Sequence, residues 1–293
     1  MYRAFFEPCV VCRPALASDM ADVLEFTKTI WDGHDYIQYV WKDWFDDPHG
    51  LLAVAQFGPR AVGMAKVTLL STRQWWLEGL RVDPAFQGRR IGSLLHEYMD
   101  DWWLHHCEGV IRLMTNSKRL QVHHLCERTG YTKVGEVLGY RLSVPAGQAP
   151  HRFQPVSEEQ VHEAVRFAAQ HLAHSGGLMD SGWRFSVPDE PTLAQWAGAG
   201  RLHWWGNREG LLAYSEDEDE DERLLSIGFA ACDTSALTDL LRDAGRLAQP
   251  NGFDGVRWLA PVDSDVGRAL SSAGFALDWE SSGYLYAKRH PGL

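Results

Sequence analysis

Residues 87–92, Gln-Gly-Arg-Arg-Ile-Gly, have the composition of a turn that binds an anion. They follow a strand-like run at residues 75–82, which Asp83-Pro84 ends because proline cannot donate a hydrogen bond to a sheet. Over residues 91–103 apolar side chains recur every three or four positions, the spacing of one buried helix face. A glycine-bearing turn that opens a helix directs free backbone N–H groups and the positive end of the helix dipole at one point. This junction therefore predicts phosphate binding.

The turn lacks the spacing of two common phosphate-binding motifs. It has neither the three glycines of the dinucleotide fingerprint nor the Gly-Lys-Ser/Thr ending of the phosphate loop in nucleotide hydrolases. It resembles the acyl-CoA pyrophosphate loop of the GNAT N-acetyltransferase superfamily, in which Gln/Arg-x-x-Gly-x-Gly/Ala follows a strand ending in Val-Asp-Pro. Gln87 and Gly92 match, while Arg90 stands where the middle glycine is usual. An ordinary connection between a strand and a helix is the alternative interpretation.

The elements expected around this junction follow the order of the same superfamily. They are strands at residues 9–14 and 110–115, helices at 18–31, 36–45 and 117–128, a hairpin of 51–56 with 61–70, and a closing hairpin at 134–144. Gly130-Tyr131 resembles the glycine and aromatic residue that end a helix in that family. The resemblance therefore covers about the first half of the chain.

The second half repeats this layout. We expect strands at residues 151–156, 202–205, 211–214, 224–231 and 256–261, with helices at 158–171, 234–248 and 265–273, and Gly274-Phe275 repeats the helix-ending signal. A self-similarity of about half the chain indicates duplication rather than a solenoid. The expected fold is α/β (α+β): two tandem GNAT-like domains, 1–145 and 151–293, each a mixed, mostly antiparallel twisted sheet flanked by helices. Because residues 232–236 contain no glycine turn, the second domain is expected to cover or complete the acceptor site without binding CoA.

The resemblance implies a site that uses acetyl-CoA as cosubstrate and no metal. Glu78 is the candidate general base. Because the usual tyrosine position aligns with Cys126, the candidate general acid is Tyr131, with Tyr36 or unassisted departure of the thiolate as the alternatives. The alternative for Glu78 is a structural glutamate paired with a nearby arginine. The expected CoA-binding residues are Leu80, Arg81, Val82, Gln87, Gly88, Arg89, Arg90, Ile91, Gly92, Ser93 and Asn116.

The acceptor is expected to lie against the loop between the first two helices, with Trp31, His34, Asp35 and Tyr36 as candidate binding residues. Asp35 has two interpretations, an ammonium ligand or a helix cap. This stretch and the later Glu-Gly-Leu-Arg-Val resemble the branch that includes the vertebrate histidine N-acetyltransferases, which implies that the acceptor is the amine of a small molecule, a free amino acid. The alternatives are a non-catalytic acyl-CoA sensor or scaffold and a protein N-acetyltransferase.

Composition narrows the class of protein. A net charge of −11 argues against nucleic acid, which needs a basic surface, and no run of residues approaches the length of a membrane span. Five cysteines without export features predict reduced thiols in the cytoplasm, in a monomer or a homodimer. The histidine pairs lack a third candidate ligand, so we expect no metal site. The acidic run at residues 216–222 is expected to be a solvated, mobile hairpin loop.

Overall fold

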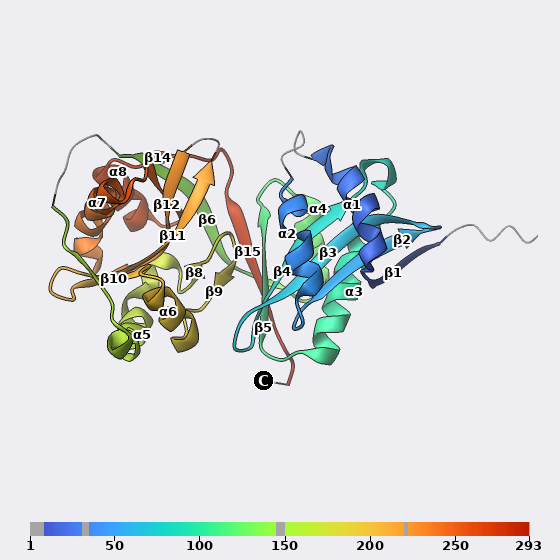
Figure 1. Ribbon diagram of the computed structural model, residues 1–293, viewed down its shortest axis with the longest axis horizontal. Helices are drawn as coiled ribbons and strands as arrows, with labels where there is room; N and C mark the ends of the chain where they lie inside the picture. Colours follow the sequence, from blue (N-terminus) through green and yellow to red (C-terminus); the bar gives the residue numbers. More distant parts are fainter. Residues whose placement is uncertain (1–8, 31–34, 145–149, 220–221, 293) are drawn as a thin grey trace, which may run out of the picture. The chain divides into compact units, whose positions relative to one another are not determined.

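The computed structural model describes residues 9–30, 35–144, 150–219 and 222–292 (Figure 1). They form two compact units. The first takes in the described residues of Met1–Leu113, His124–Tyr131 and Lys288–Leu293, and the second those of Met114–His123 and Thr132–Ala287. The last residues of the chain therefore belong to the first unit. The predicted linker at residues 145–150 lies almost wholly outside the described residues.

The first unit is built on strands that follow one another along the chain. They are β1 (Val10–Pro14), β2 (Leu51–Phe57), β3 (Arg60–Ser71), β4 (Gln74–Val82) and β5 (Val110–Asn116), of which the last residues from Met114 onward belong to the second unit. Each neighbouring pair from β1 to β4 is antiparallel, and β4 pairs with β5 in parallel. The predicted hairpin of β2 and β3 turns at Gly58, which has a φ of +60°. The strands expected in this half are thus present.

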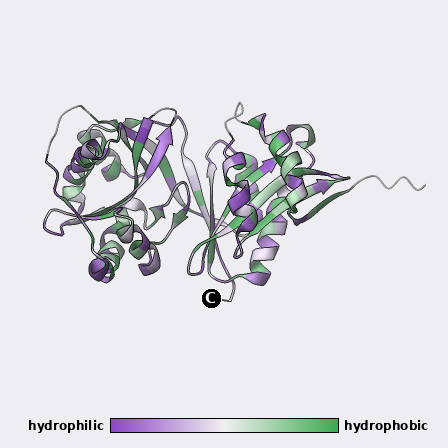
Figure 2. Ribbon diagram, viewed as in Figure 1, coloured by the Kyte–Doolittle hydropathy of each residue, from purple (hydrophilic) through white to green (hydrophobic). Residues whose placement is uncertain are grey.

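Helices cover both faces of these strands. They are the 3₁₀ turns η1 (Ala17–Asp19) and η3 (Pro84–Phe86) and the helices α1 (Met20–Thr27), α2 (Ile37–Asp46), α3 (Ile91–His106) and α4 (Leu120–Arg128). Successive residues of a strand face opposite sides, so Met64 packs with α1 and α2 while the Cα of Gly63 faces Leu95 on α3. Figure 2 shows the hydrophobic residues along β2 and β3, whose inner positions are buried.

The second unit has the same plan with its strands in the order β15-β6-β13-β12-β11-β10-β7. The strands are β6 (Thr132–Ser143), β7 (Phe153–Pro155), β10 (Leu202–Trp205), β11 (Gly210–Asp219), β12 (Glu222–Cys232), β13 (Gly255–Pro261), β14 (Ala276–Leu277) and β15 (Gly283–Arg289), with a separate pair of β8 (Met179–Asp180) and β9 (Phe185–Ser186). β12 and β13 are parallel, as β4 and β5 are, and the other ladders are antiparallel.

Two hydrophobic clusters lie on the two faces of this second sheet. The helical segments are η4 (Glu158–Gln160), α5 (Val161–His171), η5 (Leu172–Ser175), α6 (Glu190–Gly198), η6 (Thr234–Ala236), α7 (Leu237–Ala248), η7 (Gln249–Asn251) and α8 (Ser264–Ala273). Trp204 packs into the cluster with α5 and α6, while its neighbour Trp205 packs into the cluster with α7 and α8. Adjacent tryptophans on a strand therefore serve opposite faces.

The last strand of the first half, β6, belongs to the second compact unit. Its residues Val137–Ser143 pair with β13 of that unit. β15, at the end of the chain, pairs with β6 through Ala287 and then enters the first unit at Lys288. From the sequence repeat we propose that residues 1–145 and 151–293 are two copies of one domain. The compact units would then differ from the copies because β6 belongs to the second unit and residues from Lys288 onward to the first.

Two sequence predictions about local structure are wrong. The closing hairpin at residues 134–144 is the single strand β6, because Gly139 sits opposite the Trp279 ring, 2.8 Å from where a Cβ would lie, and makes no turn. The acidic run is not a loop in its described part, since residues 216–219 continue β11 and Glu222 begins β12. Arginines on neighbouring strands neutralise it: Arg257 bonds Asp217 at 3.1 Å, and Arg141 bonds Asp219 at 3.2 Å.

Candidate active site

The parallel pairing of β4 with β5 is short, and this opens one edge of β4. It joins residues 74–76 to residues 110–112 and does not continue to the end of β4 in the described part of the chain. β3, on the other side, stays paired with β4 as far as Val82. A strand edge without a ladder presents N–H and C=O groups at which an extended ligand can pair.

A β-bulge lies in the same part of β4. Met64 pairs with Arg81 and Lys66 with Glu78, so two residues of β3 span three of β4. Gly79 occupies the bulge with a φ of +67°, a left-handed conformation that favours glycine. A Cβ there would lie 2.5 Å from the ring of Trp44 on α2. The bulge thus needs glycine for two separate reasons, and it sets the direction of the neighbouring Glu78 side chain.

Glu78 is held by β3. The hydroxyl of Thr68 donates a hydrogen bond of 2.6 Å to Glu78 Oε1. Lys66, the direct partner of Glu78 in the ladder, is fully buried and forms an ion pair with Asp47. Sequence reasoning missed Lys66 and Thr68, although their spacing of two residues on a predicted strand is the signal that they share one face.

Arg81 ties the acceptor loop to β4. Its Nε donates to Asp35 Oδ2 at 2.8 Å, its Nη2 lies 3.4 Å from Asp35 Oδ1, and its guanidinium lies 5.4 Å from the centre of the Tyr36 ring. Asp35 is only 3% exposed and also accepts a hydrogen bond from the N–H of Ile37 at the start of α2. Asp35 is not the N-cap of α2, which is Tyr36, but its carboxylate is already engaged by Arg81 and by the N–H of Ile37. Partial burial raises the pKa of the Tyr36 hydroxyl, which keeps it protonated. Trp31 and His34 lie outside the described residues.

The turn between β4 and α3 takes the conformation expected for an anion-binding loop. Gly88 and Arg90 have φ values of +78° and +62°, so Arg90 adopts the left-handed conformation of the glycine that it replaces. Arg90 is the N-cap of α3, and no side chain caps this helix. Ile91 is buried and anchors the helix, whereas residues 87–90 are exposed. The first N–H groups of α3 and two arginine side chains therefore border one exposed turn.

The other predicted residues of the turn lie in or beside it. Leu80 and Val82 are on the open part of β4, Gln87 and Arg89 are exposed, and Gly92 and Ser93 form the first turn of α3. The guanidinium of Arg89 lies 5.2 Å from the centre of the Phe86 ring. A Cβ on Gly92 would meet only Val82, at 3.8 Å. The structure thus brings Glu78, Arg81, Asp35 and Tyr36 together on and against β4, which leads into the turn.

Tyr131 and Asn116 have other surroundings. Tyr131 is 2% exposed, its ring lies 5.4 Å from that of His96, and its hydroxyl has no hydrogen-bond partner among the described residues. Burial raises its pKa well above 10, and burial likewise raises the pKa of Cys126 to about 12. Asn116 belongs to the second unit, where its Nδ2 donates to Ser281 Oγ at 2.7 Å. Their predicted roles stay predictions.

Comparison with known protein families identifies the first unit. The model of the "Acetyltransferase (GNAT) family" matches residues 18–131, which include the bulge, Glu78 and the whole turn. These residues belong to the GNAT family. The human "Probable N-acetyltransferase 16" is 24% identical over 210 residues, which cover 65% of this chain. The match spans 57% of the length of that relative.

Solved structures extend the likeness to the GNAT fold over nearly the whole chain. A GCN5-related N-acetyltransferase from Sphaerobacter thermophilus has a TM-score of 0.64 at 15% identity, covering 97% of both chains. A tandem GNAT protein from the clavulanic acid biosynthesis pathway has a TM-score of 0.60 at 13% identity, covering 96% of this chain and 98% of its own. At these identities the likeness concerns the fold alone. The predicted fold class of two tandem GNAT-like domains is confirmed.

Two general features bear on the class of site. Within the described ranges, no group of three or more histidine, cysteine, aspartate or glutamate side chains is placed to hold a metal ion. None of the helices in the described part of the chain is long and apolar enough to cross a membrane. The His123 ring bonds the Ser117 carbonyl through Nε2 at 3.1 Å and the Tyr286 hydroxyl through Nδ1 at 3.1 Å. This pairing accounts for one of the histidines that suggested a metal ligand.

Proposed function

We propose that the first unit transfers the acetyl group of acetyl-CoA to the amine of a small molecule, with Glu78 as the general base. Three features that follow one another along β4 carry the proposal. The strand loses its parallel partner after residue 76, the glycine bulge at Gly79 sets the direction of Glu78, and the turn after the strand opens α3 without a side-chain cap. These features hold a linear donor and a base beside each other. Positioning of both reactants supplies a large part of the rate enhancement in such a reaction.

The residues present fit acyl-CoA. Its pyrophosphate would bind at residues 87–93, where backbone N–H groups and two guanidiniums can meet the charge. The backbone of Leu80 to Val82 would pair with the extended pantetheine arm, as the family resemblance implies. Acetyl-CoA supplies an activated thioester when bound, so the N–C bond forms as the C–S bond breaks.

Glu78 would take the proton that the amine must lose, directly or through a water. An amine is mostly protonated near neutral pH, so a positioned base contributes ~10²–10⁴ in rate. The hydrogen bond from Thr68 fixes the carboxylate, and the protonated phenol of Tyr36 is a donor on the same side of the site for the thiolate that leaves. Tyr131 would serve this role only if the first unit opened around it, because its side chain is buried.

We propose a free amino acid as the acceptor. Support comes from the resemblance of residues 30–37 and 77–82 to the histidine N-acetyltransferase branch and from the similarity to an N-acetyltransferase. Since Asp35 is bound by Arg81, its part would be to hold the loop against β4 rather than to bind the ammonium group. A protein N-terminus and an acyl-CoA sensor without turnover are the alternatives, and they differ from this proposal in measurable ways.

The test is Glu78→Gln, with release of free thiol from acetyl-CoA measured against single amino acids and polyamines. Thiol release with one acceptor, lost in Glu78→Gln while acetyl-CoA still binds, supports the proposal. Loss of both binding and turnover would make Glu78 a structural residue. Full turnover in the variant would refute its role as base. Binding of acetyl-CoA without turnover on any small amine would favour the sensor or a macromolecular acceptor.

Two control variants make the outcome specific. Glu25→Gln makes the same chemical change on the exposed face of α1, where the Glu25 carboxylate forms an ion pair with Lys28. This variant should leave turnover unchanged. Arg89→Glu combined with Arg90→Glu reverses charge at the turn and should weaken acetyl-CoA binding while Glu78 stays in place. Equal binding in this double variant would refute the assignment of the pyrophosphate to the turn.

A further inference from the structure

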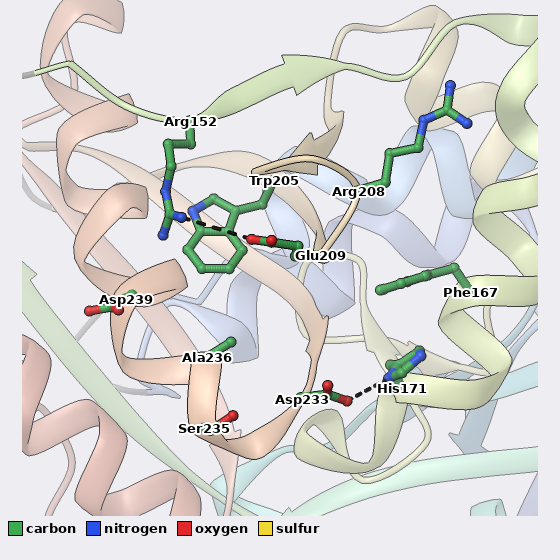
Figure 3. A pocket seen from close by; sticks show the side chains of 10 residues that line it. All are labelled: Arg152, Phe167, His171, Trp205, Arg208, Glu209, Asp233, Ser235, Ala236 and Asp239. Atoms are coloured by element: carbon green, nitrogen blue, oxygen red, sulfur yellow. Dashed lines mark ion pairs between the residues drawn. The ribbon is translucent and has the colours of Figure 1, made fainter.

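The second unit contains a cavity of about 550 Å³ where β12 ends and α7 begins (Figure 3). Its position matches that of the candidate CoA turn in the first unit. β12 has a parallel partner, carries an extra residue at Gly228 in its pairing with β11, and leads through η6 into α7. Likewise, β4 has a parallel partner, carries an extra residue at Gly79 in its pairing with β3, and leads through η3 into α3. The second unit has kept the site of the first but has lined it with different residues.

One wall of the cavity carries guanidinium groups. Arg152 lies with its guanidinium 3.9 Å from the centre of the Trp205 ring, and its Nε bonds Asp243 Oδ2 at 3.1 Å. Asp243 is 2% exposed and also accepts bonds from Trp205 at 2.8 Å and Arg246 at 2.7 Å. A single buried carboxylate is thus shared by two guanidiniums, of which only Arg152 lines the cavity.

Arg208 and Glu209 complete this wall from the turn between β10 and β11. Arg208 is neutralised by Glu163, which it binds at 2.7 and 2.8 Å. Glu209 Oε2 forms a long ion pair of 3.9 Å with Arg152 Nη1, marked in Figure 3, without a direct hydrogen bond. Arg152 therefore keeps donors that face the cavity, and they can bind a carboxylate of a ligand.

The start of α7 supplies carboxylates on another side of the cavity. In Figure 3 Asp239 lies below Arg152 and Asp233 lies beside His171, with Ser235 between the two carboxylates. Asp239 is neutralised by Arg242, whose Nη1 donates to Asp239 Oδ1 at 3.0 Å. Asp233 Oδ1 lies 3.3 Å from His171 Nδ1, and the His171 ring stacks on Phe167 at 4.4 Å between centres. This part of the cavity combines negative charge with an aromatic surface, which suits an ammonium group and a short side chain.

We propose that this cavity binds a free amino acid as a zwitterion, with its carboxylate toward Arg152 and its ammonium group toward Asp233. A nucleotide or polyphosphate would meet these carboxylates with like charge, and a simple cation would meet the guanidinium. The volume lies within the range of about 300–1,000 Å³ that small-molecule sites occupy. All the residues that line this cavity belong to the second unit, and the proposed binding needs no acyl-CoA.

The experiment measures binding of the twenty amino acids to the full chain without acyl-CoA, by titration calorimetry and tryptophan fluorescence. Arg152→Gln removes the proposed carboxylate ligand, and Arg246→Gln removes the other guanidinium on Asp243, which does not line the cavity. We expect Arg152→Gln to weaken binding by about tenfold or more, equivalent to about 1.4 kcal/mol, and Arg246→Gln to leave it within about threefold. Ser235→Phe, at an exposed position of η6, should block the cavity and abolish binding.

Several outcomes would overturn the proposal. They are no binding of any amino acid up to millimolar concentration, equal losses in the two arginine variants, and tighter binding of inorganic phosphate than of any amino acid. Amino-acid binding is also measured in Glu78→Gln. An acceptor bound in the first unit would not respond to Arg152→Gln or Ser235→Phe, so the comparison separates the two sites. Absence of acetyl transfer would thus refute the proposed function and leave this proposal standing.

Discussion

The bulge at Gly79 offers the sharpest test of how the fold prepares the site. Replacing Gly79 with alanine places a Cβ at a φ of +67° and 2.5 Å from the Trp44 ring. The left-handed conformation costs about 1–2 kcal/mol for a residue with a Cβ. The overlap with Trp44, which is buried, adds about 1–3 kcal/mol because the ring must move. We therefore expect Gly79→Ala to lower the free energy of unfolding by about 2–5 kcal/mol.

Gly58→Ala is the matched control. Gly58 has a φ of +60° in the β2–β3 turn, and a Cβ added there would have no atom within 4 Å, so only the conformational cost of about 1–2 kcal/mol applies. Both variants are compared with the parent chain by urea denaturation and by acetyl transfer. Gly79→Ala should also reduce turnover, because it displaces Glu78, while Gly58→Ala should not.

A double-mutant cycle isolates the contact with Trp44. Trp44→Leu alone leaves a cavity in the cluster of α1, α2, β2 and β3 and should destabilise the first unit. Combined with Gly79→Ala it gives the new methyl group room, so the two losses should sum to more than the loss in the double variant. Equal destabilisation by Gly79→Ala and Gly58→Ala, or additive losses in the cycle, would refute the reasoning from the Trp44 contact.

Two further predictions concern stability. Burial raises the pKa of Asp180 from 3.8 to about 7, so ionisation of this group lowers the free energy of unfolding as pH rises from about 4 to 7. In denaturation at several pH values, Asp180→Asn should therefore be more stable than the parent chain by up to ~4 kcal/mol at pH 8. Below about pH 4 the two chains should be equally stable. A chain ending at Ala287 loses the 2.7 Å Lys288–Asp100 ion pair and the hydrogen bond of His290 to the Leu104 carbonyl on α3. Its free energy of unfolding should fall by ~3–5 kcal/mol, and its affinity for acetyl-CoA should fall as well. A chain ending at His290 keeps both contacts and should match the parent chain. A flat difference for Asp180→Asn, or equal behaviour of the two truncated chains, would contradict these expectations.

Local patterns predicted the elements well because local chemistry decides them. Gly130 and Gly274 were expected to end helices, and they have φ values of +85° and +94°. The turn at residues 87–92 was recognised from its glycines and its place between a strand and a helix. Spacing could not reveal that β6 belongs to the second unit, because a strand satisfies the same alternating pattern in either sheet.

The site was predicted less completely than the turn that leads from it. Glu78 and Arg81 were named from the resemblance, but the partners that fix them, Thr68 and Asp35, depend on strand register and on a loop that returns to β4. The bulge that sets this register occupies one glycine, and a glycine within a strand run does not reveal a bulge by itself. Tyr131 was expected at the reaction centre from its position in the sequence, while its burial follows from packing against α3.

The two units show which part of the scaffold is structural and which part selects a ligand. Both central strands carry an extra glycine after the last residues paired in parallel, and in each a Cβ would meet a tryptophan, Trp44 beside Gly79 and Trp196 beside Gly228. The bulge therefore belongs to the fold, since it persists in the unit without an anion-binding turn. Ligand chemistry lies in the few residues that follow. In the proposed roles, the left-handed turn at residues 88–90 would expose backbone N–H groups to the pyrophosphate, whereas in the cavity before α7 Asp233 would meet an ammonium group and Arg152 a carboxylate.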